Sequence, residues 1–205
     1  MRSCPARYGC PSRGSSPSGR DDGPTQSGYH RGVTSFDQTL PATLAALHEL
    51  EFDYAGGEGM DFEPYDEFFP AEENAAWIRA WTGNASLDGA AYRIFGQDGT
   101  GGYAAFWLVR EGEPIERQPI VFFGSEGELG VVASDLSDYL WLLADGVGPM
   151  EAVEYGAGAP KPHAEFTAFA QTHAPDAKKS GAEVLARASA EFPTFSEDFL
   201  AQCGH

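Results

Sequence analysis

Four short apolar runs follow one another between residues 92 and 133, and each has the length of a β-strand. They are YRIFG, YAAFWLVR, PIVFFG and LGVVA, and polar segments that contain glycine or proline separate them. Separators this short suit turns between neighbouring strands and are too short for crossover helices, so the pattern predicts an antiparallel meander. No other feature constrains the fold as strongly, because four successive strands have to share one sheet.

Helical patterns lie on both sides of these strands. We expect a helix after the last strand, beginning at Ser134 or Asp135 and ending at Gly146. Ser35 and Gln38 resemble a capping box for a first helix. The predicted helices cover about 36–50, 71–83, 134–146, 164–173 and 182–191, with a last turn at 195–200. This order predicts a single α+β domain, with a largely antiparallel or mixed sheet that helices cover mainly on one face.

Two glycine-rich corners connect the strands. GQDGTGG, at 96–102, has the glycines of a phosphate loop, but it joins two strands and no lysine lies nearby. Asp98-Gly99 therefore predicts a hairpin turn, and the same reasoning makes GSEGE, at 124–128, a turn. Glu126 and Glu128 in that corner leave an acid and base pair open, and Glu126 is the starting point for an enzyme hypothesis.

Charge divides the chain into a basic head and an acidic body. The whole chain carries a net charge of -18, yet residues 1–31 hold five Arg and only two Asp. Residues 1–32 are built mainly of Gly, Ser, Pro and Arg, so we expect a disordered basic tail before a folded domain over 33–205. Signals of order begin just after Val33, which makes that residue a candidate alternative start. The acidic body repels nucleic acid and anionic membranes and attracts basic partners.

The acidic charge is concentrated between Glu49 and Glu73. This stretch holds ten Asp or Glu and no Lys or Arg, and six Phe or Tyr are interleaved with them. One interpretation is a solvated face whose aromatic side chains point into the core. The other is a surface for a basic protein, in which aromatic side chains anchor and carboxylates steer. For that surface we predict Glu58, Asp61, Glu63, Tyr65, Asp66 and Glu67 as partner-binding residues.

The sequence predicts no metal site, no cofactor and no catalytic residue. The histidines lack the spacing of a zinc helix, and the segment 61–67, although it could bind calcium weakly, does not match the twelve-residue calcium loop. Cys4, Cys10 and Cys203 lie in the two tails, so we expect no disulfide framework. We find no signal peptide and no apolar run approaching the roughly 18 residues of a membrane span, and we expect a cytoplasmic protein.

The order of hairpins, the GSEGE corner and the helix after it resemble the SUKH superfamily. This is the fold shared by a fungal cell-wall assembly regulator of the Smi/Knr type and many bacterial immunity proteins. The resemblance covers about a quarter of the chain, in YRIFGQDGTGGYAAFWLVREG and QPIVFFGSEGELGVVASDLSDYLWLLADG, between Tyr92 and Gly146. Residues 40–83 match the N-terminal helices of the family more loosely. The basic tail and a helical extension after Gly158 lie outside the pattern.

The resemblance implies a sheet packed against helices, no enzymatic activity, and a role in binding other proteins. In bacterial members the partner is often a nuclease toxin, which is usually basic, and the acidic body fits such a partner independently. We therefore expect an immunity protein that binds and neutralises a basic toxin domain. Two alternatives stay open at this point: a regulatory scaffold of the same fold, and a small-molecule enzyme that uses Glu126.

Overall fold

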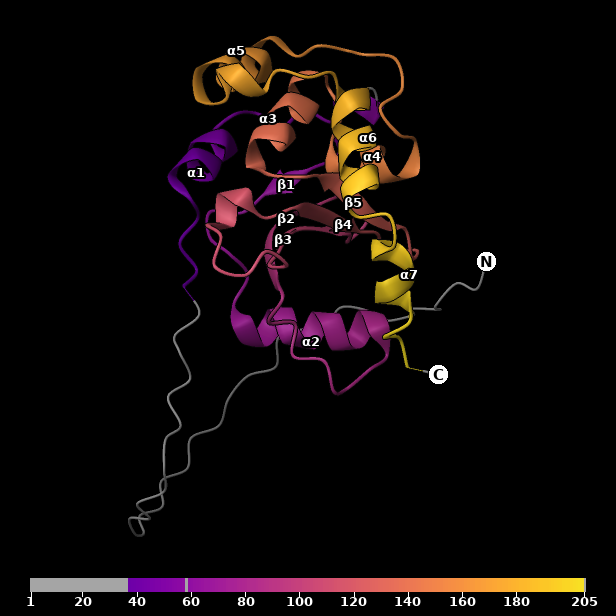
Figure 1. The fold of residues 1–205 in the computed structure, drawn as a ribbon. Coiled ribbons are helices and arrows are strands. Elements are labelled where there is room, and N and C mark those ends of the chain that lie inside the picture. Colours follow the sequence, from indigo (N-terminus) through magenta and orange to yellow (C-terminus); the bar gives the residue numbers. More distant parts are fainter. Residues whose placement is uncertain (1–36, 58, 205) are drawn as a thin grey trace.

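A computed structural model describes residues 37–57 and 59–204 of the chain. They contain one five-stranded sheet in the order β1-β2-β3-β4-β5, in which every neighbouring pair is antiparallel (Figure 1). The strands are β1 (Glu63–Pro64), β2 (Tyr92–Gln97), β3 (Tyr103–Trp107), β4 (Ile120–Phe123) and β5 (Leu129–Ala133). The predicted α+β class and the predicted meander are thus confirmed.

The helices precede and follow the four-stranded meander. The α-helices are α1 (Ala42–His48), α2 (Ala71–Thr82), α3 (Leu136–Ala144), α4 (Pro149–Glu154), α5 (Ala164–His173), α6 (Gly181–Glu191) and α7 (Phe195–Leu200). Short 3-10 turns are η1 (Ala55–Gly57), η2 (Ile115–Arg117) and η3 (Pro175–Ala177). No helix in the described ranges is both long and apolar enough to cross a membrane.

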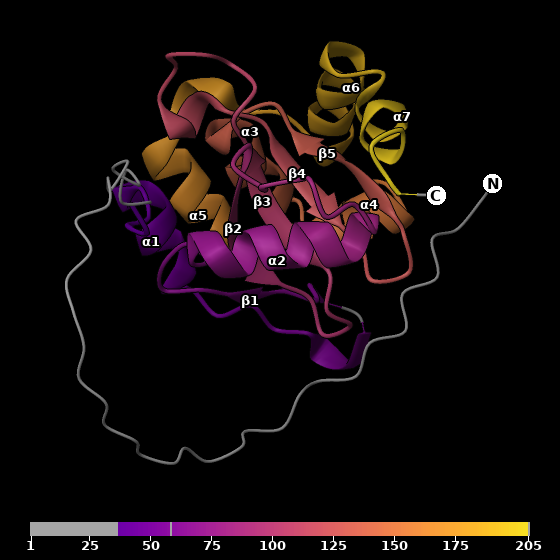
Figure 2. The same cartoon turned by 90° about the horizontal axis from the view of Figure 1, so that it is seen from below.

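Helices cover both faces of the sheet, with a core on each, so the expectation that helices cover mainly one face is wrong. Helices α1, α3, α4 and α5 lie over one face, and α2 lies across the other (Figures 1 and 2). Each strand sends alternate side chains to the two sides. In β4, Phe122 packs into the core beneath α3, whereas Val121 and Phe123 pack into a second core with Ile78 of α2. All four residues of β4 are consequently buried.

The C-terminal extension is an integral part of this domain. Helix α5 packs along α3, and α6 contacts both α3 and β5. The chain then passes the β5 edge, and Phe195 and Phe199 of α7 join the core on the side of α2 (Figure 2). Tyr139 of α3 packs on Phe95 of β2, and Leu142 contacts Gly181 of α6, so both side chains are fully buried.

Several element boundaries differ from the sequence-based predictions. The first helix begins at Ala42, and Gln38 donates its side-chain amide to the Phe68 carbonyl, so Gln38 does not form a capping box. Ser35 and Phe36 lie outside the described residues. Strand β3 ends at Trp107, three residues before the predicted end, and α4 was not predicted at all.

Candidate partner-binding surface

The predicted binding residues lie along the edge of the sheet formed by β1. Glu63 and Pro64 pair with Gln97 and Gly96 of β2, and no strand of the described residues pairs with the other side of β1. The neighbouring Phe62 is buried, and its ring lies so close to Gly96 that a Cβ there would come within 2.2 Å of it. Buried aromatic contacts therefore fix the position of the edge strand.

The aromatic side chains of the acidic stretch divide between the core and the surface. Phe62 and Phe68 are buried in the core, as the solvated-face interpretation required of them. Tyr65 and Phe69 are half-buried, and their rings stack with centroids 5.8 Å apart and planes 13° apart. The solvated-face interpretation is thus confirmed for Phe62 and Phe68, whereas Tyr65 and Phe69 pack only partly against the second core and keep some surface accessible.

Tyr65 is held in one position by its neighbours. Its hydroxyl donates a hydrogen bond of 2.8 Å to Gln97 Oε1, and Gln97 Nε2 donates one of 2.8 Å to Glu63 Oε2. Burial raises the pKa of the Tyr65 hydroxyl, and the nearby Tyr103 adds to the shift. The ring of Tyr65 lines a hollow of about 560 Å³ formed by residues 64–70. A fixed, half-buried ring beside a hollow is suited to serve as an anchor for a partner.

Three of the predicted carboxylates are accessible and one is engaged. Glu63, Asp66 and Glu67 are exposed. Asp61 is half-buried, and its Oδ1 accepts a hydrogen bond of 2.9 Å from the backbone N–H of Gly99, at the tip of the β2–β3 hairpin. The prediction for Glu58 falls outside the described residues. We call Asp61, Glu63, Asp66 and Glu67 the β1 acidic surface.

Glu151 of α4 was missed by sequence reasoning, although it touches this surface. Its Oε1 accepts a hydrogen bond of 2.9 Å from the Asp61 backbone N–H, across 90 positions of the sequence. Burial raises the pKa of the Glu151 carboxyl, and the charges of Asp61 and Asp98 raise it further, while hydrogen bonds from backbone N–H groups oppose the shift. No sequence signal paired these two residues, because Glu151 belongs to the helix that was not predicted.

The acidic charge extends from Asp61 toward the β4–β5 turn. Glu126, Glu128, Glu151 and Glu154 line a hollow of about 600 Å³ together with Asp61. Lys161 is the one basic side chain among its described lining residues. The fold therefore joins four carboxylates from two separate segments, the β4–β5 turn and α4, to one end of the β1 acidic surface.

Hydrogen bonds within the two glycine corners define them as turns. Asp98 is buried in the first, and its Oδ1 accepts hydrogen bonds from the N–H groups of Thr100 and Gly102. In the second, Gly124 donates its N–H to the Glu128 carbonyl at 2.6 Å, and Gly127 has a φ of 102°. Both predicted turns are confirmed, and Glu126 lies exposed on the second.

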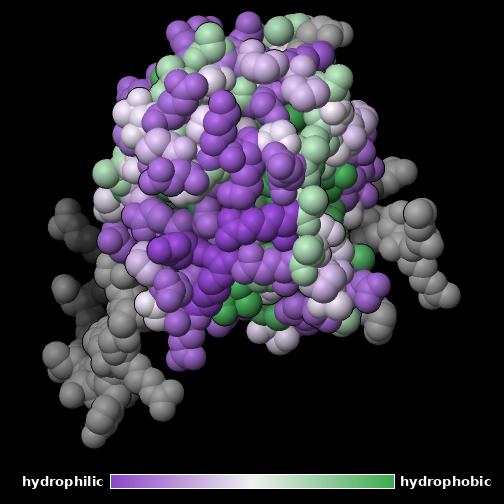
Figure 3. All heavy atoms as spheres, turned by 45° about the horizontal axis from the view of Figure 1, so that its top comes forward, coloured by the Kyte–Doolittle hydropathy of each residue, from purple (hydrophilic) through white to green (hydrophobic). Residues whose placement is uncertain are grey.

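Charges on the β1 acidic surface have no opposite partner within residues 37–57 and 59–204. None of its four carboxylates forms an ion pair there. The ion pairs among described residues lie elsewhere: Glu191 binds Arg110, Asp138 binds Lys179 and Arg187, and Asp135 binds Arg187. We call Asp135, Asp138, Lys179 and Arg187 the α3–α6 ion cluster. The helical face of the domain is broadly hydrophilic (Figure 3).

Histidines do not create a metal site in the described part of the chain. No group of three or more His, Cys, Asp or Glu side chains there is arranged to hold a metal ion. His48 is only partly accessible, its Nδ1 lies 2.7 Å from the Tyr65 carbonyl oxygen, and burial lowers its pKa. Its contact with residue 65 helps to position the segment that follows β1.

Comparisons with known proteins found no match. No protein-family model matches this chain, and neither a curated protein nor a solved structure matches it.

Proposed function

We propose that the protein binds a basic protein domain through the β1 acidic surface, with Tyr65 as an aromatic anchor. The observation that carries the proposal is that Asp61, Glu63, Asp66 and Glu67 form no ion pair with any residue in the ranges 37–57 and 59–204, and lie beside a fixed, half-buried ring. Like charges so close together repel one another in the free protein, and a basic partner relieves that repulsion on binding. Glu58 belongs to the same acidic stretch and to the same proposal.

Within this proposal, the function that fits best is that of a cytoplasmic immunity protein. A nuclease-type toxin domain is basic where it holds the phosphates of its substrate, and a strongly acidic surface complements that groove. The resemblance to the SUKH superfamily supports the same class of function. The protein needs no catalytic residue, cofactor or metal to act in this way.

The test compares two variants with the same change in net charge. Glu63→Lys, Asp66→Lys and Glu67→Lys together reverse the accessible part of the β1 acidic surface, whereas Asp61 keeps its hydrogen bond to Gly99. Glu111→Lys, Glu113→Lys and Glu116→Lys form the control, because these side chains are also exposed but lie around η2. Basic proteins captured from the native cells serve as partners, and association and dissociation are measured by surface plasmon resonance.

We expect the first variant to slow association at least about tenfold at low salt, and the control to slow it much less. Charges are screened over about 8 Å at physiological salt, so association of the unchanged protein should slow steeply as salt is added. Tyr65→Ala should mainly speed dissociation. Equal slowing by both variants, or association that ignores salt, contradicts the proposal. Loss of the partner's nuclease activity on binding separates neutralisation from scaffolding.

A further inference from the structure

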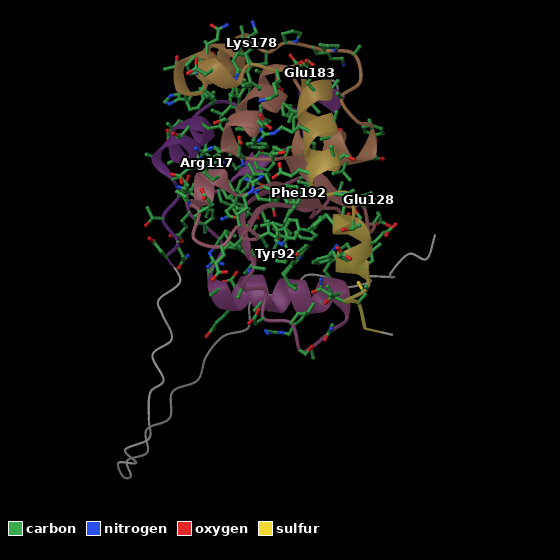
Figure 4. The ribbon with its side chains drawn as sticks, viewed as in Figure 1. Tyr92, Arg117, Glu128, Lys178, Glu183 and Phe192 are labelled. Carbon is green, nitrogen blue, oxygen red and sulfur yellow. The ribbon has the colours of Figure 1, made fainter. Side chains whose placement is uncertain are left out.

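A separate cavity of about 280 Å³ lies on the α2 side of the sheet. It opens between α2, α7, the loop at residues 87–91 and the ends of β2 and β3. Its apolar walls come from Ile78, Tyr92, Trp107, Phe195 and Phe199. Figure 4 shows Tyr92 in the layer between the sheet and α2. The β1 acidic surface contributes none of the described residues that line this cavity.

The aromatic walls are fixed by contacts with one another. Tyr92 meets Phe199 edge to face, with ring centroids 5.8 Å apart and planes 83° apart. Trp107 packs on Phe195 with centroids 4.8 Å apart. Packed rings of this kind form a preorganised apolar wall, because they lose little conformational freedom when a ligand binds.

The loop that closes the cavity is also held in place. Asn74 of α2 is buried, and its Nδ2 donates hydrogen bonds to the carbonyls of Gly89, at 2.8 Å, and Tyr92, at 3.3 Å. Gly89 has a φ of 66°, and a Cβ at that position would come within 3.2 Å of the Ala75 Cα. A glycine is therefore required where the loop approaches α2.

Two polar groups of the wall are open to a ligand. Neither the Tyr92 hydroxyl nor the Trp107 indole N–H forms a hydrogen bond with a residue in the ranges 37–57 and 59–204. Neither atom is among the fully buried polar atoms that lack a partner in those ranges, so both are accessible to solvent and to a ligand in the cavity. Burial raises the pKa of the Tyr92 hydroxyl, which keeps it protonated and able to donate or accept.

The rim of the cavity is acidic. Asp88 and Asp198 line it, both are exposed, and its described lining includes no Lys or Arg. Asp88 Oδ1 accepts from the Ala90 N–H at 2.9 Å, and Asp198 Oδ2 accepts from Thr194 Oγ1 at 2.8 Å. The other oxygen of each carboxylate accepts no hydrogen bond from the described residues. Aromatic faces and carboxylates both attract cations.

We propose that this cavity binds a small organic cation, an ammonium or amidinium group carried on an aromatic or branched apolar body. The body lies against Ile78, Phe195 and Phe199, and the charged group lies toward Asp88 and Asp198, within reach of the aromatic faces. The Tyr92 hydroxyl receives or donates the remaining hydrogen bond. This binding does not depend on the protein partner proposed above, because it uses different residues on a different face.

The probe is 2-phenylethylamine, with 2-phenylethanol as its uncharged counterpart. Binding to the full chain is followed through the NMR signal of the Trp107 indole N–H. Ala91→Trp fills the cavity from an exposed lining position, and Ala85→Trp is the control, because Ala85 is also exposed but does not line the cavity. N-acetylarginine methylamide, added separately, tests whether the cation is instead the side chain of a protein.

We expect the amine to bind at least about fivefold more tightly than the alcohol, since the alcohol lacks the charge. Ala91→Trp should abolish binding, Ala85→Trp should leave it unchanged, and Asp88→Asn with Asp198→Asn should remove the preference for the amine. Tyr92→Phe, which keeps the ring, should weaken binding severalfold. Equal affinities for amine and alcohol, an unshifted Trp107 signal, or tighter binding of the arginine derivative would each overturn the proposal. The protein-binding proposal is tested separately, by the association rates of the variant with the reversed β1 acidic surface, so the two proposals can fail independently.

Discussion

The β1 acidic surface and the α3–α6 ion cluster have opposite charge arrangements within one small domain. In the cluster, Asp138 is 0% exposed and binds both Lys179 and Arg187, whose side chains are 30% and 42% exposed. On the β1 acidic surface, Glu63, Asp66 and Glu67 are exposed and form no ion pair among the described residues. The domain thus places scarce basic side chains where a buried carboxylate needs them, and leaves the exposed carboxylates to an outside partner.

The largest effect should come from removing both cations of the α3–α6 ion cluster. Lys179→Met together with Arg187→Met leaves the buried Asp138 without a counter-charge, and breaking a buried pair from one side is strongly destabilising. We expect a loss of about 3 kcal/mol in the free energy of unfolding, measured by urea denaturation at neutral pH.

The control for this change is made on the β1 acidic surface. Glu63→Gln, Asp66→Asn and Glu67→Gln should each change the free energy of unfolding by less than about 0.5 kcal/mol, as is usual for exposed positions. Asp138→Asn should recover part of the stability of the double Met variant, because it removes the buried charge. If the two regions respond equally, the distinction between paired and unpaired charge fails.

For Glu151 we expect an effect of intermediate size on the free energy of unfolding. The dependence of that free energy on pH tests the contact between α4 and Asp61. A carboxyl whose pKa is raised in the folded state contributes most stability where it is protonated, and loses that contribution as pH rises through its folded value. Glu151→Gln keeps an oxygen for the Asp61 N–H but cannot ionise. We therefore expect the stability of the unchanged protein, relative to Glu151→Gln, to fall as pH rises above the ordinary glutamate value of 4.5. Urea denaturation at several pH values measures this, and a constant difference would contradict it.

The strands and turns could be predicted from the sequence, whereas the faces of the sheet that the helices cover could not. The runs at 92–96 and 119–124, the Asp98 turn and the Asp135 N-cap predicted elements that the structure contains. The apolar run of β4 is uninterrupted, which indicates a strand buried on both faces. Such a strand argues against a sheet that helices cover mainly on one face. The expectation of cover mainly on one face came instead from the order of helices, strands and helices, which is typical of α+β domains.

The site was harder to predict because its geometry depends on contacts between distant segments. The acidic stretch was recognisable by composition, and Glu63, Asp66 and Glu67 are accessible as that prediction required. Asp61 is engaged by Gly99 and Glu151, and neither contact leaves a local pattern. Helix α4 contains only six residues and begins with a Gly-Pro pair, which is too short for helical periodicity to be visible.

Removing residues 1–32 tests whether the chain supplies its own counter-charge to the β1 acidic surface. These residues hold five Arg but very little apolar surface, and they lie outside the described ranges. We expect their removal to change the free energy of unfolding by less than about 1 kcal/mol. A fall of about ten degrees or more in melting temperature would contradict the prediction. A loss that disappears at high salt would identify the arginines as partners of the surface.

The smallest effect should come from Glu126→Gln, which removes an exposed carboxylate from the β4–β5 turn. Glu126 is exposed, and its backbone N–H, which the substitution keeps, makes the hydrogen bond to Glu128 Oε2. The turn itself depends on the Gly124 N–H and the positive φ of Gly127, neither of which involves the Glu126 side chain. We expect a change of less than about 0.5 kcal/mol in the free energy of unfolding and unchanged binding of a basic partner. Denaturation and surface plasmon resonance measure the two quantities.

If purified protein turned over a small molecule and this substitution abolished the turnover, Glu126 would belong to an active site. The exposed carboxylates at this end of the domain would then serve chemistry, and the contrast between paired and unpaired charge would no longer identify a protein-binding surface.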